Sequence, residues 1–250
     1  MRRCWWVLIL VSAVVALTLG VLAQRQQQRD RLRMIVQQQC VPHWLAEQRP
    51  APCSRVTLQD SGPDPQGYAV LHDRKGGAHF LLIPTRTTGG IESLPISGSA
   101  VPNYFAAAWS ERALLTEGAP APLPRSAIGL AVNQRSARSQ DQLHIHMSCL
   151  RPELARALQQ QRSRIGPAWS ALEFAGHRYQ ALRIMEAELG AADPVRLLAE
   201  GVAGARAALA NYTLLLAGEQ FAEGPGFVLL ASANAPGAEL LLDPRCALAR

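Results

Sequence analysis

Residues 139–149 read "SQDQLHIHMSC" and place two of the six histidines of the chain, His144 and His146, in an apolar run. Side chains alternate between the two faces of a β-strand. A strand over 142–150 would therefore direct one set of residues into a core, namely Leu143, Ile145 and Met147. Its other face would carry a row of polar side chains: Gln142, His144, His146 and Ser148. Such a row on an otherwise apolar strand indicates a functional site.

The residues alone leave three interpretations of this polar face open. It could simply face solvent. Two histidines on one face can also bind zinc, but a third ligand is needed, and no spacing singles out one of the other four: His43, His72, His79 and His177. The third interpretation is nucleophilic catalysis, in which a neutral imidazole attacks phosphorus and the second imidazole stabilises the phosphoryl oxygens. We favour it because Asn133, Gln134 and Ser139, neutral polar groups suited to holding phosphate, lie just upstream.

The rest of the chain predicts an α+β protein with a mainly antiparallel sheet. We expect a hairpin from 67–74 and 78–86, a loop over 87–100, a helix over 101–115, strands over 127–133 and 142–150, and a helix over 151–166. The pattern loosely recurs as strands over 177–186, 211–217 and 226–233, with a helix after Asp193. This recurrence suggests a second α+β layer packed on the first.

The N-terminus contains an uncharged stretch of 20 residues, Cys4–Ala23. As a helix it would be about 30 Å long, which matches the bilayer core. A cleaved signal peptide is the alternative, but the stretch is longer than a usual signal core, so we favour a retained transmembrane anchor over 1–23. The polar segment 24–39, "QRQQQRDRLRMIVQQQ", reads as a stalk helix that lifts the domain off the membrane.

Four cysteines follow the anchor. An even number in an exported chain suggests two disulfides in an oxidising compartment. Cys40 and Cys53 bracket a short proline-containing loop and would pair, which leaves Cys149 to pair with Cys246; four free thiols are the alternative. No C-x-x-C zinc pattern is present. We therefore expect a short cytoplasmic N-terminus and a globular part outside.

The charge of the chain does not indicate a nucleic-acid partner. The formal net charge is +6, but its basic residues are scattered arginines, with Lys75 the single lysine. No aromatic-rich basic stripe is present. We expect a solvated surface and no binding of nucleic acid.

Several stretches together resemble one protein family. "QLHIHMS" is similar to the histidine-triad motif, in which three histidines alternate with apolar residues, although Gln142 stands in the first position. "VNQRSARSQDQLHIHMSCLRP", "GYAVLHDR", "FLLIPTR" and "PNYFAAAW", with the flanking cysteine segments, resemble the membrane-bound CDP-diacylglycerol pyrophosphatases. The resemblance extends from about Cys40 to Cys246.

The resemblance implies a histidine-triad-like hydrolase domain over 40–250, with an antiparallel sheet and flanking helices, behind the anchor 1–23 and the stalk 24–39. It implies hydrolysis of CDP-diacylglycerol to CMP and phosphatidate through a nucleotidyl intermediate on His144, with His146 stabilising the phosphoryl oxygens. Asn133, Ser139 and Gln142 would bind the substrate, and no metal or cofactor would be needed. The enzyme would act at the bilayer, on the periplasmic side of the inner membrane.

Two alternatives from other classes remain. One is a metal-dependent phosphohydrolase in which His144 and His146 are ligands. The other is a non-catalytic, membrane-tethered module that binds a nucleotide or lipid, with Gln142 marking the loss of activity.

Overall fold

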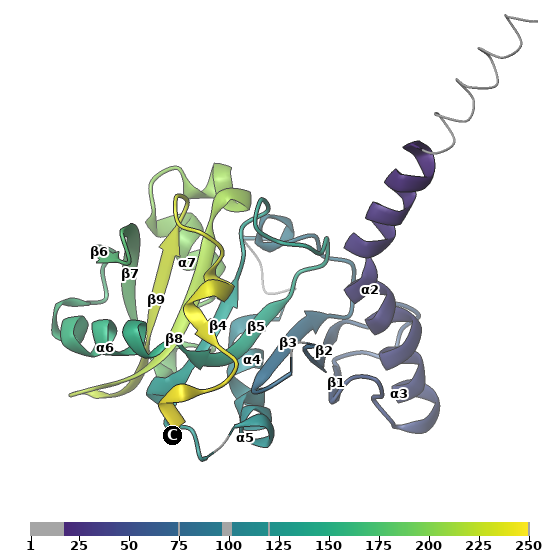
Figure 1. Ribbon diagram of the computed structural model, residues 1–250, viewed down its shortest axis with the longest axis horizontal. Coiled ribbons are helices and arrows are strands. Elements are labelled where there is room, and N and C mark those ends of the chain that lie inside the picture. Colours follow the sequence, from purple (N-terminus) through teal and green to yellow (C-terminus); the bar gives the residue numbers. More distant parts are fainter. Residues whose placement is uncertain (1–17, 75, 97–101, 120, 250) are drawn as a thin grey trace, which may run out of the picture.

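The computed structural model describes residues 18–74, 76–96, 102–119 and 121–249 (Figure 1). Its labelled helices are α2 (Arg31–Ile35), α3 (Val41–Glu47), α4 (Tyr104–Ser110), α5 (Leu115–Gly118), α6 (Pro152–Gln161) and α7 (Pro194–Gly201). Its strands are β1 (Arg55–Leu58), β2 (Gly67–His72), β3 (His79–Pro84), β4 (Ile128–Val132), β5 (Ile145–Leu150), β6 (Ser170–Phe174), β7 (His177–Met185), β8 (Thr213–Phe221), β9 (Gly224–Ser232) and β10 (Leu242–Asp243).

The strands form one antiparallel sheet in the order β1-β2-β3-β5-β4-β8-β9-β7-β6, and β10 pairs with the end of β5. The expected second α+β layer is therefore wrong, because the second half of the chain extends the first sheet through the pairing of β4 with β8. Every residue of β4 is buried, as are most residues of β8. Strands that are apolar on both faces belong inside a sheet, where both edges are paired and both faces are covered.

Most of the elements expected from the sequence are confirmed. These are the hairpin of β2 and β3, the strands β4, β7, β8 and β9, and the helices α4, α6 and α7. Asn103 caps α4 through a hydrogen bond from the backbone amide of Ala106, and Asp193 caps α7. The short strands β1 and β6 were not expected.

The strand expected over 142–150 begins only at Ile145. The cause is Pro84 at the end of the neighbouring strand β3. The register pairs Leu82 with Ile145, and its continuation would pair Pro84 with Leu143. Proline has no N–H to donate to a ladder. The amide of Leu143 instead donates to the carbonyl of Thr88 in the loop after β3, at 2.6 Å.

Apolar clusters cover both faces of the sheet. One face packs against α4 and α7 in a single large cluster. The other face carries two separate clusters, one beneath α2 and α3 and one beneath α6 and the segment 233–249, which we call the C-terminal strap. The strap, yellow in Figure 1, contacts β4 and β8 and pairs with β5 through β10.

The N-terminal part of the described chain is helical from residue 18 and leads into α2. Figure 1 shows its first turns extending away from the sheet, whereas Leu32 and Val36 are buried against it. Packing on the sheet thus begins before residue 40, where the sequence suggested the domain would start. Most of the predicted anchor lies outside the described residues. In the part of the chain that is described, no helix is both long and apolar enough to cross a membrane.

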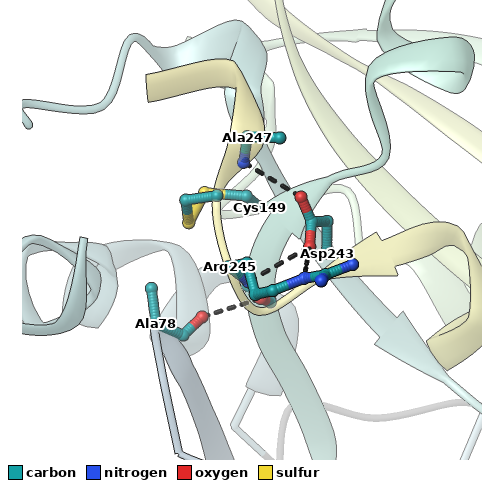
Figure 2. The surroundings of a disulfide bond; sticks show 7 residues. Ala78, Cys149, Asp243, Arg245 and Ala247 are labelled. Atoms are coloured by element: carbon teal, nitrogen blue, oxygen red, sulfur yellow. Dashed lines mark hydrogen bonds and ion pairs between the residues drawn. A yellow bond between two sulfur atoms is a disulfide. The ribbon is translucent and has the colours of Figure 1, made fainter. Parts of the chain in front are cut away.

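Both expected disulfides are confirmed. Cys40 is bonded to Cys53, and Cys149 to Cys246. Figure 2 shows the second bond, which joins β5 to the strap. The strap turns beside it because the carboxylate of Asp243 accepts hydrogen bonds from the backbone amides of Arg245 and Ala247, at 3.1 and 2.9 Å. Disulfides of this kind are typical of an oxidising, extracytoplasmic compartment.

Candidate active site

The two histidines of the opening stretch point to the same side of the sheet. Their neighbours Leu143, Ile145 and Met147 lie in the cluster that packs against α4 and α7, so the expected alternation of faces is confirmed. His146 stands directly opposite Leu81 on β3 and Ala131 on β4. Those two residues belong to the two separate clusters of the other face. The histidines therefore lie in the gap between these clusters.

A cavity of about 270 Å³ opens at this gap. Its lining comes from α2, from β2 and β3 with the turn between them, from the β4–β5 loop, from β5 and from the strap. The lining residues are Arg31, Leu32, Ile35, Leu71, His72, Asp73, Arg74, Leu81, Asn133, Ala137, Ser139, Gln140, His144, His146 and Glu239. The cavity thus combines an apolar wall, two arginines and two carboxylates around the histidine pair.

The backbone of Gln142, two residues earlier, holds the ring of His144 in one orientation. Its Nδ1 lies 2.7 Å from the carbonyl oxygen of Gln142. A carbonyl can only accept, so Nδ1 carries the proton and Nε2 keeps its lone pair. Burial lowers the pKa of His144, and this effect outweighs the opposing influence of the Gln142 hydrogen bond and the charge of Glu239. The side chain is therefore a neutral imidazole whose Nε2 is available to a ligand in the cavity.

His146 lies within a chain of polar side chains. Its Nδ1 is 3.0 Å from Nε2 of His79, a buried residue at the start of β3. Its Nε2 is 3.6 Å from a carboxylate oxygen of Glu239, which the strap supplies. The rings of His144 and His146 meet edge to face, with centroids 4.8 Å apart. The site therefore contains a third histidine and an acid that the sequence did not single out.

His79, His146 and Glu239 form the one group among the described residues that could jointly hold a metal ion. His146, however, uses opposite ring nitrogens toward the other two. Because the lone pairs of one imidazole ring diverge, an ion on either nitrogen would leave one of the two partners on the far side. A row of polar side chains, with a hydrogen bond between His79 and His146 and Glu239 beyond, fits this arrangement better than a three-ligand zinc site. His144, expected as a ligand in the metal-dependent alternative, is outside the group.

Of the three residues expected to bind substrate, Asn133 and Ser139 line the cavity. Asn133 follows β4, and its amide holds the strap: its Oδ1 accepts from the amide of Glu239 at 3.0 Å, and its Nδ2 donates to the Glu239 carboxylate at 3.4 Å. Ser139 is exposed in the β4–β5 loop.

Gln142 is fully buried and is not part of the cavity lining. Its Nε2 donates to the carbonyls of Pro84 and Arg86, and its Oε1 accepts from the amide of Thr88. These bonds fix the start of the segment that carries His144 to the loop after β3.

The loop before His144 is also tied to the N-terminal helix. The side-chain amide of Gln140 lies between two backbone groups of the N-terminal helix: its Nε2 donates to the carbonyl of Gln28 at 2.9 Å, and its Oε1 accepts from the N–H of Leu32 at 3.1 Å. It thus replaces one i→i−4 helical hydrogen bond. Arg29 makes two hydrogen bonds of 2.6 Å to the carboxylate of Asp141. The Arg29 guanidinium holds the pKa of Asp141 below its usual range. Segment 24–39 is thus joined to the β4–β5 loop and supplies one wall of the cavity through α2.

The sequence did not single out His79 or Glu239, and only His79 could have been found from a sequence pattern. His79 begins the run "HFLLIP", which puts it on the same strand face as Leu81, and the register that sets Leu81 opposite His146 brings it beside that histidine. Glu239 lies in a short loop-like segment far from the histidines in sequence and left no such signal.

Comparison with protein families identifies the family of the chain. The model of one family, described as CDP-diacylglycerol pyrophosphatase, matches residues 27–250. The match includes the helix that walls the cavity, both histidines, the strap and all four bonded cysteines. The chain therefore belongs to the CDP-diacylglycerol pyrophosphatase family, whose activity is hydrolysis of CDP-diacylglycerol.

Proposed function

We propose that the protein hydrolyses CDP-diacylglycerol to CMP and phosphatidate through a covalent intermediate on His144. The observation that carries this mechanism is the state of the His144 ring. Its Nδ1–H is bound to the Gln142 carbonyl, its burial favours the neutral form, and its Nε2 is left as a nucleophile at the cavity.

In the first step, Nε2 of His144 attacks the phosphorus that carries cytidine. The bond from this phosphorus to the bridging oxygen breaks, and the electron pair leaves with phosphatidate. In the second step, water attacks the same phosphorus, the N–P bond breaks, and its electrons return to Nε2. One proton of the water is released, and the products are CMP, phosphatidate and the original neutral histidine.

The other lining residues have supporting roles. His146, beside His144, donates to phosphoryl oxygens as charge develops on them. Asn133 and Ser139 are neutral hydrogen-bonding groups at the same cavity. Arg31 and Arg74 add positive charge that favours a pyrophosphate. Gln142 acts through its backbone carbonyl on His144, and direct contact of its side chain with substrate finds no support in the cavity lining.

The fold and location follow the same proposal. An antiparallel sheet with an alternating histidine strand is consistent with a histidine-triad-like domain, in which Gln142 occupies the first triad position. Two disulfides and the apolar stretch Cys4–Ala23 support a domain on the periplasmic side of the inner membrane, next to its lipid substrate.

The test is the His144→Ala variant, assayed with detergent-dispersed CDP-diacylglycerol and with both products identified. Turnover should be abolished, because no other side chain offers an equivalent nucleophile at this position. His72→Ala is the matched control: His72 lines the cavity edge and bonds the Gly77 carbonyl at 2.8 Å. It should retain turnover. Turnover by His144→Ala near that of the unmodified protein would refute the mechanism, and loss of activity on chelation would favour the metal-dependent alternative.

A further inference from the structure

Glu239 occupies an unusual position for a carboxylate. It lines a cavity that receives an anionic pyrophosphate, and its negative charge opposes binding of that group. Its carboxylate nevertheless lies 3.6 Å from Nε2 of His146 and is oriented by the Asn133 amide. Substrate binding alone does not account for an acid in this position.

The strap is built to bring Glu239 close to the histidines. The Glu239 amide is held by Asn133, and the amide of the preceding Ala238 donates to the hydroxyl of Thr213 at 2.7 Å. At Gly237 a Cβ atom would lie 2.6 Å from the Asn133 oxygen, so only glycine permits this approach. Beyond Glu239, β10 and the Cys149–Cys246 bond fix the strap to β5.

The second step of the proposed reaction needs a base that His144 cannot supply. In the intermediate, Nε2 of His144 is bonded to phosphorus, and Nδ1–H remains bound to the Gln142 carbonyl. In the proposed mechanism His146 donates to the phosphoryl oxygens, so it cannot also accept the proton of the water; its Nδ1 lies 3.0 Å from His79 and its Nε2 lies 3.6 Å from Glu239. Of the two carboxylates that line the cavity, Asp73 follows β2, and Glu239 lies 3.6 Å from Nε2 of His146.

We propose that Glu239 is the general base that activates water for hydrolysis of the nucleotidyl-His144 intermediate. The carboxylate takes a proton from the water as its oxygen bonds to phosphorus. The N–P bond breaks, and its electron pair returns to Nε2 of His144. The proton is then lost from Glu239 to solvent as CMP leaves. This role rests on the proposed covalent mechanism and names the residue that catalyses its second step, hydrolysis of the intermediate.

The experiment is rapid-quench kinetics of the full-length Glu239→Gln variant with CDP-diacylglycerol. Glutamine keeps the size and hydrogen-bonding capacity of the side chain but cannot accept the proton. Phosphatidate should appear in a burst of about one equivalent per active site, and CMP should follow slowly. Steady-state turnover should fall about 10²–10⁴-fold, the usual contribution of general base catalysis. Mass spectrometry of acid-sensitive adducts should find CMP on His144.

Asp73→Asn is the matched control, since it removes the other carboxylate of the cavity, and it should accumulate no adduct. Circular dichroism of each variant checks the fold. Equal slowing of both steps in Glu239→Gln, without a burst or adduct, would overturn the role of base. Failure of the covalent mechanism itself has a different signature, namely turnover by His144→Ala and no adduct in any variant.

Discussion

Removal of the Cys149–Cys246 bond should cost more folding stability than removal of the Cys40–Cys53 bond. The two bonds close loops with sequence separations of 97 and 13 residues. Loop closure in the unfolded chain gives about 4.7 kcal/mol for the longer loop and about 2.9 kcal/mol for the shorter one. All four cysteines are buried, so replacement of the side chains themselves contributes similarly to both variants. The double variants C149A/C246A and C40A/C53A should therefore differ by about 1.8 kcal/mol in free energy of unfolding.

Urea denaturation, followed by circular dichroism, measures this difference directly. Activity gives a second readout, because the longer bond also anchors the strap that carries Glu239. At low temperature, where both variants remain folded, C149A/C246A should lose more turnover than C40A/C53A. Equal unfolding midpoints together with equal turnover would refute the reasoning, since neither loop length nor strap anchoring would then matter.

Three further predictions concern the nucleophile and the N-terminal segment. The attack requires neutral His144, so activity is present above the pKa of this group and is lost as the pH falls through it. Because burial lowers the pKa of His144, the acid limb of the pH profile of kcat/KM should lie below 6.5, the ordinary histidine value. An acid limb above pH 6.5 would contradict this prediction. Deletion of residues 1–23 should leave kcat on detergent-dispersed substrate nearly unchanged and reduce hydrolysis of bilayer-embedded substrate, because tethering raises the local enzyme concentration. Deletion of residues 1–36 should abolish both activities, because it also removes α2 and with it one wall of the cavity; activity of this second, folded truncation would refute the role of α2.

The local features of the site could be predicted from the sequence. Alternation within "LHIHM" separates the core residues from the histidines whatever the rest of the fold does, because it depends only on strand geometry. The pairing of Cys149 with Cys246 followed because Cys40 and Cys53 bracket a short loop. Features set by neighbours in sequence were thus available before the structure.

The polar composition of segment 24–39 concealed its packing. Leu32, Val36 and Cys40 recur every four residues and form a narrow apolar stripe on one helix face. The surrounding glutamines and arginines made the whole segment read as a solvated stalk. Its docking depends on Gln140 and Asp141, about 110 residues away, and such a long-range contact leaves no local pattern. The start of β5 was displaced for a related reason, since Pro84 lies on a different strand.

The two disulfides hold the segments that complete the site. The segment with His144 and His146 provides only the floor of the cavity, and two outlying segments provide its walls. One is α2, which leads into the helical segment that Cys40–Cys53 fixes near β1. The other is the strap with Glu239, which Cys149–Cys246 fixes to β5. Each bond ties one wall to the sheet, so an oxidising compartment would favour assembly of the cavity as well as stability of the fold. Under this reasoning, the reduced protein keeps its nucleophile but loses the geometry that hydrolyses the intermediate.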